Sequence, residues 1–293
     1  MPKVQSLLVG TDFSEESGHA AARASLLGAD LGCDRGTLAH VQEPGTLASL
    51  NTLLGRGAPA AEDVRKALAE RLAAASEEAV SGSFRLRPEL LAGRPHVELS
   101  RLAAEHDLVV LGARGSHYLR ERLVGTLPQR LLGRMNKPLL VVRHAPEASY
   151  GSILVGVDFS EDSQHAITWA RTIAPDAHLH LVHSFRHSQE LAMHYANVTP
   201  GLIAEYREQA RQRSEAELLR FVGSIGVPEA QVTPWVEEGD PAMGLCRRAA
   251  EVGSNLIVVG KRGTSEAADL LFGSVTQRLL GEARCDLLVT PHL

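Results

Sequence analysis

The sequence predicts an α/β protein built from two tandem, doubly wound domains. Each domain is expected to hold a five-stranded parallel sheet with helices on both faces, and the two domains are expected to pair as a pseudo-dimer. Three observations support this prediction. The chain contains an internal repeat, each repeat alternates short apolar strands with helices, and a length of 293 residues suits two domains of ordinary size.

The internal repeat is most evident in its glycines. Gly112-Ala-Arg-Gly115, nine residues and Gly125-Thr126 recur as Gly260-Lys-Arg-Gly263, nine residues and Gly273-Ser274. Segment 7–15, with Asp12-Phe-Ser near its end, recurs as 153–161 with Asp158-Phe-Ser, and Gly93-Arg-Pro95 recurs as Gly239-Asp-Pro241. A period this long indicates duplicated domains rather than a solenoid of short units. We place the domains at residues 1–147 and 148–293.

The first half begins with a short apolar strand that ends at a glycine. A helix follows, capped by Ser14 or Ser17. The elements expected in this half are, in order, strand 6–9, helix to about 31, strand 37–41, helix 62–80, strand 85–91, helix 96–105, strand 108–111, helix 126–135 and strand 139–143.

The second half repeats this order. Its strands are expected at 153–157, 178–183, 233–236, 256–259 and 286–290. Short Val, Leu and Ile strands that alternate with helices indicate a parallel sheet buried on both faces. The last strand of each half lies at an edge, and we expect 139–143 to pair with 286–290 because exposed edge strands need a partner.

Composition excludes several classes of protein. The chain has 30 basic and 35 acidic residues, so its net charge of −5 disfavours general binding to nucleic acid. It lacks an apolar run of about 18 residues, so no membrane span is expected. The first strand begins at once, leaving no room for a signal peptide, and three scattered cysteines suggest reduced thiols. We therefore expect a cytoplasmic protein.

The spacing of the glycines suggests a phosphate site. In open α/β sheets, ligands bind at the carboxyl ends of strands, and each glycine pattern begins where the fourth strand ends. Glycine allows the backbone to approach an anion closely. Thr126 and Ser274 then open helices whose free N–H groups favour phosphate. The alternative is that the glycines only make tight turns.

A carboxylate ends the first strand of each half. Asp12 and Asp158 could bind the hydroxyls or the base amine of a nucleoside. The alternative is that each aspartate caps the following helix. We favour contact with a ligand.

These motifs together resemble the universal stress proteins, in a tandem (UspA-like) arrangement that covers both halves. The resemblance implies an adenine-nucleotide-binding α/β fold, often dimeric, with a regulatory role in stress. It implies ATP or AMP as ligand, with hydrolysis that is slow or absent, and Mg²⁺ as a possible companion ion. It also implies that backbone groups at the end of the second strand hold the adenine, which here are those of Val41 and Ser184.

The two copies depart from the family pattern in different ways. The second reads Gly273-Ser-Val275-Thr276 and fits the phosphate turn fully, whereas the first has Pro128 in place of Thr276 and so lacks an N–H and a hydroxyl. Arg114, Lys261 and Arg262 lie beside the glycines and could neutralise phosphate charge. Segment 116–124 is basic, whereas segment 264–272 holds two acids and no base. Shape therefore favours the second site and charge favours the first.

Other functions remain open. The chain could be a carrier or scaffold that binds a small apolar ligand in one domain, or an ATP-using adenylyl transferase on a related fold, although it lacks the phosphate motifs of such enzymes. No catalytic set can be assigned by spacing, and His178, His180 and His183 are interpreted as ordinary strand histidines rather than metal ligands. A homo-oligomer or an unknown regulatory protein is the expected partner.

Overall fold

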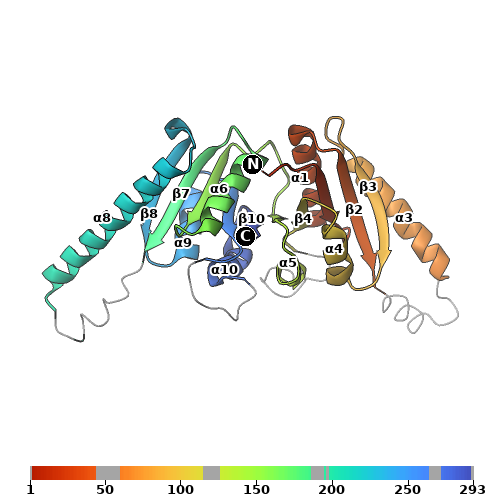
Figure 1. Ribbon diagram of the computed structural model, residues 1–293. Helices are drawn as coiled ribbons and strands as arrows, with labels where there is room; N and C mark the ends of the chain where they lie inside the picture. Colours follow the sequence, from red (N-terminus) through yellow and green to blue (C-terminus); the bar gives the residue numbers. More distant parts are fainter. Residues whose placement is uncertain are drawn as a thin grey trace. The chain divides into compact units, whose positions relative to one another are not determined.

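The structure is a computed structural model that describes residues 2–43, 60–114, 126–185, 195, 198–263 and 272–291. It divides into two compact units, which Figure 1 shows with most of their elements labelled. The first unit comprises Met1–Ser149 together with Cys285–Pro291, and the second comprises Tyr150–Arg284 with the last two residues. The predicted α/β fold with mostly parallel strands is confirmed.

In the first unit, strands β3, β2, β1, β4, β5 and β10 lie side by side in that order, and all pairs are parallel except β5 with β10. Helices α1 and α3 contact each other and the sheet, as do α4 and α5, which gives a helical layer on each face. The elements are β1 (Ser6–Gly10), α1 (Glu15–Leu31), β2 (Arg35–Gln42), α3 (Ala61–Glu78), β3 (Leu86–Ala92), α4 (Pro95–Ala103), β4 (Leu108–Gly112), α5 (Thr126–Leu132), β5 (Leu139–Val142) and β10 (Asp286–Thr290).

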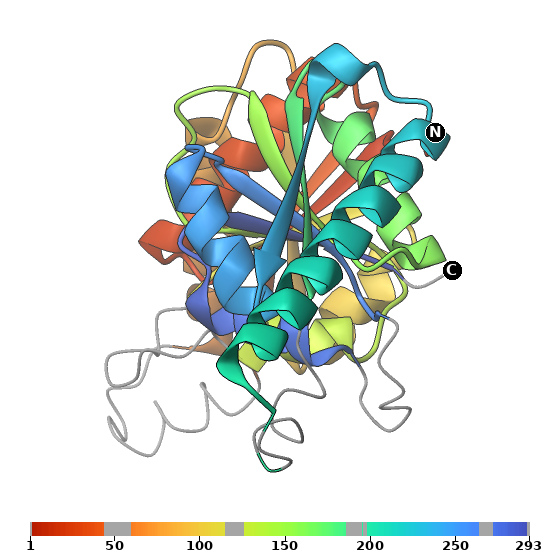
Figure 2. The same ribbon diagram turned by 90° about the vertical axis from the view of Figure 1, so that its left-hand side faces the viewer.

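In the second unit, four parallel strands follow the order β9, β6, β7 and β8. Helix α9 contacts α10, β7 and β8, while α6 packs on β6 and β9 and the long α8 packs on β7 and β8, as Figure 2 shows from the side of α8 and α9. The elements are β6 (Ser152–Val157), α6 (Glu161–Ile173), β7 (His178–Phe185), α8 (Pro200–Ser224), a short 3-10 turn (Glu229–Gln231), β8 (Val232–Glu238), α9 (Pro241–Glu251), β9 (Leu256–Gly260) and α10 (Ser274–Glu282).

The central strands are buried along their whole length. Every residue of β1, β5 and β10 is buried, which is why the middle of each strand reads as an apolar run. Ser14 caps the start of helix α1, because its hydroxyl accepts the N–H of Ser17. Gly32 caps the end of the helix in a left-handed conformation with φ 62°. No helix among the described residues is long and apolar enough to cross a membrane.

Strand β10 pairs with β5, as expected from the sequence. The two strands run antiparallel, with Leu287 opposite Val141 and Val289 opposite Leu139. Asp286 fixes this register, because its carboxylate accepts the backbone N–H of Arg143 at 2.8 Å and lies 3.5 Å from the Nε of Arg23 on α1. Both charged side chains are almost fully buried. Hydrogen bonds between the two strands and a buried ion pair therefore hold β10 against β5.

A buried histidine links strand β2 to helix α4. His106 is 2% exposed, its Nδ1 donates to the carbonyl of Leu102 at 2.9 Å, and its Nε2 accepts the hydroxyl of Thr37 at 3.0 Å. This arrangement uses the neutral ring, with its proton on Nδ1. Burial, the largest effect, lowers the pKa of His106 below its ordinary value, and Arg35 adds to that lowering.

The free energy of unfolding should therefore fall in mild acid. The folded chain holds His106 neutral, so its contribution is complete above about pH 6.5, the ordinary histidine pKa, and declines as pH falls through the lower folded value. Urea unfolding between pH 7.5 and 5 should show this loss, with a slope of at most about 1.4 kcal/mol per pH unit for one proton. His106→Asn should be less stable at pH 7.5 but lose less stability in acid. An equal acid loss in both proteins would contradict this assignment.

Candidate functional site

The fourth strand of each unit ends against the first turn of the helix that follows strand one. A Cβ added to Gly112 would lie 2.7 Å from the backbone carbon and oxygen of Glu16 on α1. A Cβ added to Gly260 would lie 2.9 Å from the Cβ of Asp162 on α6. Real Cβ contacts are not this short, so both positions require glycine. This contact brings the start of each glycine pattern to the end of strand one.

The turn that follows strand one has the same geometry in both units. Oδ1 of Asp12 accepts the backbone N–H of Ser14 at 3.1 Å and also its hydroxyl. Oδ1 of Asp158 accepts the corresponding groups of Ser160. The side chains that cap helices α1 and α6 are those of Ser14 and Ser160, not the aspartates. Each aspartate instead holds the turn that leads into its helix.

In the second unit, Asp158 lies beside the glycine pattern. A Cβ on Gly263 would be 2.5 Å from Oδ2 of Asp158, so the second glycine of the pattern and the strand-one aspartate are neighbours. The same aspartate also accepts the hydroxyl of Ser163 through Oδ1. The structure thus brings together two groups that the sequence places more than a hundred residues apart.

The end of the second pattern folds back on its start. The N–H of Gly273 donates to the carbonyl of Lys261 at 2.8 Å, and the buried hydroxyl of Thr276 donates to the carbonyl of Gly260 at 3.0 Å. Helix α10 begins at Ser274, after Gly273 as its N-cap, and has no side-chain cap. Ser274 is exposed and Val275 half-buried. These two hydrogen bonds to backbone carbonyls therefore hold the first turn of α10 beside Gly260 and Lys261.

Positive charge lies next to both patterns. Arg262 is exposed, and Lys261 is half-buried. Burial, followed by the nearby Arg262 guanidinium, lowers the pKa of Lys261. A bound anion would reverse this effect by favouring the charged form. In the first unit, Arg114 is exposed at the equivalent position to Arg262.

The first pattern is described only at its ends. Gly115 and Gly125 lie outside the described residues, as does the side chain of Thr126, although the backbone of Thr126 begins helix α5. Pro128 is buried within the first turn of α5. A proline is tolerated there because N–H groups of the first turn have no partner within the helix.

Val41 and Ser184 occupy equivalent places near the ends of β2 and β7. Gly10 pairs with Ala39 and Gly156 with Val182, so both residues lie two positions beyond these pairs. Val41 is 8% exposed. The hydroxyl of Ser184 is buried and has no hydrogen-bond partner among the described residues.

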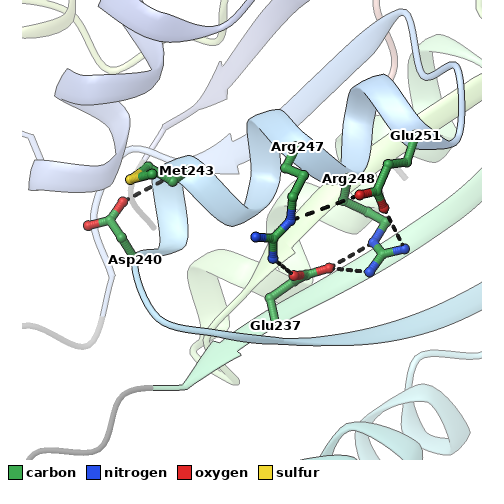
Figure 3. Close-up of polar contacts among 6 residues, drawn as sticks. All are labelled: Glu237, Asp240, Met243, Arg247, Arg248 and Glu251. Atoms are coloured by element: carbon green, nitrogen blue, oxygen red, sulfur yellow. Dashed lines mark hydrogen bonds and ion pairs between the residues drawn. The ribbon is translucent and has the colours of Figure 1, made fainter.

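A charged cluster at the end of β8 was not foreseen from the sequence. Glu237 is 4% exposed and binds both Arg247 and Arg248 of α9, and Glu251 pairs with Arg248 at 2.8 Å (Figure 3). Arg248 also stacks on Trp235, with its guanidinium carbon 4.0 Å from the ring centroid. The signal available in the sequence was an acid near the end of a strand, followed by two adjacent arginines on the next helix.

Asp240 connects the start of α9 to α10. It accepts the N–H of Met243 at 3.1 Å, as Figure 3 shows, and pairs with Arg278 of α10 at 2.6 Å. Within the described residues, no group of three or more His, Cys, Asp or Glu side chains could hold a metal ion. A magnesium ion that arrives with a nucleotide remains an expectation from the sequence.

Substitution of Gly112 should destabilise the protein more than substitution of a glycine in open space. Gly112→Ala places a methyl group against the backbone of Glu16, which cannot rotate away, so the free energy of unfolding should fall by about 2 kcal/mol. Gly281→Ala, on α10 with nothing within 4 Å, should be neutral or stabilising by up to about 1 kcal/mol. Urea denaturation measures both, and equal effects would argue against the close contact.

Comparisons with known proteins give the same result for both halves of the chain. The sequence pattern of the universal stress protein family matches residues 3–143 and again residues 149–291. A universal stress protein of Mycolicibacterium smegmatis is 28% identical over 97% of this chain and 96% of its own. One from Mycobacterium bovis is 26% identical over 78% and 77%. The crystal structure of a universal stress protein from Archaeoglobus fulgidus covers 99% of both chains with a TM-score of 0.61 at 19% identity, a likeness of fold. This chain belongs to the universal stress protein family, with two copies of the family's domain in tandem.

Proposed function

We propose that the chain is a regulatory protein of the stress response that binds an adenine nucleotide, ATP or AMP, at its glycine patterns. The observation that carries this proposal is the position of Asp158 against Gly263, at the carboxyl end of the sheet. A carboxylate suits the hydroxyls or the base amine of a nucleoside, and a glycine turn suits its phosphates. One bound nucleotide would contact both the carboxylate and the glycine turn.

The geometry of α10 supports phosphate binding. The helix is nine residues long and begins after Gly273 without a side-chain cap. Its first N–H groups and its dipole therefore favour an anion. Lys261 and Arg262 add charge on the same turn, and Thr276 holds α10 to the end of β9. The proposed site of the second unit comprises Asp158, Ser184, Gly260, Arg262, Gly263, Gly273, Ser274, Val275 and Thr276.

The equivalent site of the first unit comprises Asp12, Val41, Gly112, Arg114, Gly115, Gly125 and Thr126. Pro128 stands where Thr276 closes the turn in the second unit, so the first unit lacks that hydroxyl contact to its fourth strand. Backbone groups beside Val41 and Ser184 would hold the adenine. The protein is proposed to act in the cytoplasm, with a second copy or a regulatory protein as partner.

Purified protein should bind ATP with a dissociation constant between micromolar and millimolar, as measured by calorimetry. Gly263→Ala should weaken binding at the second unit at least about tenfold, because its methyl group would displace the carboxylate of Asp158. Gly281→Ala is the matched control and should bind as the wild type does, since it adds a methyl group to open space.

A flat titration of the wild type with millimolar ATP and with AMP would contradict the proposal. Mass spectrometry of any small molecule that co-purifies then separates the alternatives. An apolar compound would identify a carrier or scaffold, whereas an adenylylated product would identify a transferase.

Hydrolysis of ATP should be slow or absent, well below the roughly 10 s⁻¹ median of enzymes. Fast attack needs a base or a positioned water at the γ-phosphate. The sequence offers His117, Glu266 and Asp269 for this role, and all three lie outside the described residues. A magnesium-dependent phosphate-release assay measures the rate. Turnover above about 1 s⁻¹ that is abolished by changing one of these residues would make the protein an ATPase.

A further inference from the structure

Both units contain a phenylalanine in a backbone conformation that bulky residues rarely adopt. Phe13 has φ 63° and Phe159 has φ 64°, and they are the non-glycine residues with positive φ in the described chain. Each directly follows the strand-one aspartate. A bulky residue in the left-handed region is held there by its surroundings, and such strain gathers at functional sites.

The surroundings that hold each phenylalanine include a histidine. The ring of Phe13 lies on that of His40 with centroids 4.4 Å apart, and the ring of Phe159 lies on that of His183 at 4.3 Å. The interplanar angles are 35° and 32°. We call His40 with Phe13, and His183 with Phe159, the His–Phe pairs.

Each histidine also binds the backbone just before the aspartate. Nδ1 of His40 lies 2.8 Å from the carbonyl oxygen of Thr11, and Nδ1 of His183 lies 2.9 Å from that of Val157. A carbonyl oxygen only accepts, so Nδ1 carries the proton and donates. The histidine therefore contacts the aspartate turn on both sides. It binds the carbonyl of the residue before the aspartate, and it packs on the ring of the phenylalanine after it.

The histidines sit next to the other expected contact of the nucleoside. His40 precedes Val41, and His183 precedes Ser184. Resting on the nucleotide function proposed above, we propose that each His–Phe pair positions the strand-one aspartate relative to the end of strand two, so that both meet one nucleoside. The pair does not touch the ligand but acts through Asp12 and Asp158.

The packing around the pairs differs between the units, whereas the pairs themselves do not. In the first unit, the guanidinium carbon of Arg71 lies 4.6 Å from the centroid of the Phe13 ring. In the second, Phe221 of α8 meets Phe159 edge to face at 5.6 Å. An arginine thus contacts the phenylalanine in the first unit, and an aromatic ring contacts it in the second. If the phenylalanine served only to fill the core, the histidine contact would be expected to vary in the same way.

The test measures discrimination among nucleotides rather than affinity alone. The wild type and its variants are titrated with ATP, with 2′,3′-dideoxy-ATP, which lacks the ribose hydroxyls, and with inosine triphosphate, which lacks the base amine. Asp12→Asn/Asp158→Asn identifies which of the two preferences depends on the aspartates. We expect the preference for ATP over one of the two analogues to fall about tenfold, which is the effect of losing one hydrogen bond to a charged group.

His40→Leu/His183→Leu should reduce that same preference by a similar factor and leave the other unchanged. His40→Asn/His183→Asn, whose amide can donate where Nδ1 does, should restore part of it. A purely structural role would weaken all three nucleotides equally. If the leucine variants fail to fold by circular dichroism, Phe13→Asn/Phe159→Asn replaces them, because asparagine tolerates positive φ without the ring.

The outcomes separate the two proposals. If the wild type binds no nucleotide, the proposed function fails and the His–Phe inference falls with it. If the wild type binds but the aspartate variants keep both preferences, nucleotide binding stands and the positioning role is overturned. The same conclusion holds if the aspartate variants lose a preference that the histidine and phenylalanine variants retain.

Discussion

The close contact between the end of strand four and the first turn of the helix that follows strand one sets the geometry of each unit. Gly112 lies against Glu16, and Gly260 lies against Asp162, at distances that leave no room for a side chain. Any Cβ there would push the strand away from the helix. Because the contact is kept, the loop that leaves strand four passes the aspartate turn, and in the second unit Gly263 reaches Asp158. Carboxylate, glycine turn and helix start are neighbours as a consequence of this packing.

The buried charges Arg23, Asp286 and Glu237 each have a charged partner. Asp286 and Arg23 are 4% and 5% exposed, and Asp286 also accepts a backbone N–H of β5. A buried ion pair adds little net stability, but removal of one partner costs several kcal/mol, so its clearest effect is on register. A strand that docked on β5 without a carboxylate at this position would make neither the ion pair with Arg23 nor the hydrogen bond to Arg143. These contacts therefore favour β10 as the neighbour of β5.

Much of the fold could be predicted from the sequence because local patterns dictate it. Apolar runs such as Leu139–Val142 are buried throughout, and Ser14 caps α1 as its position suggests. The errors at strand ends, where β2 starts at Arg35 and β7 continues to Phe185, arise where a strand extends beyond its apolar run. Pairing with β1, β3 and β8 decides those residues, and local propensity does not.

The candidate site was predictable only in part, for the same reason. Glycine spacing marked the turn proposed to hold phosphate, but the positive φ of Phe13 and its contact with the ring of His40, from another strand, have no local signal. Likewise, Glu237 directly follows the strand expected at 233–236, and nothing local to it predicts its pairing with Arg247 and Arg248. Contacts between distant segments leave no local pattern. The repeat does carry a trace of this contact, since an Asp-Phe-Ser turn and a histidine near the end of strand two occur in both halves.

The two units have equivalent glycine contacts and aspartate turns, but they differ in the charges around these features. In the first, burial and then Arg134, Arg130 and Arg94 lower the pKa of His96, so three arginines gather near α4 and α5. In the second, the matching positions hold Glu282, Arg278 and Asp240, and Arg278 pairs with both acids. Positive charge attracts anions over distance, whereas a closed turn selects them at contact. If both units hold an anion as proposed, the first is suited to attract it from solution and the second to fit its shape. The aspartate turn and the glycine contact at the end of strand four are the same in both units, whereas the charges around them have diverged.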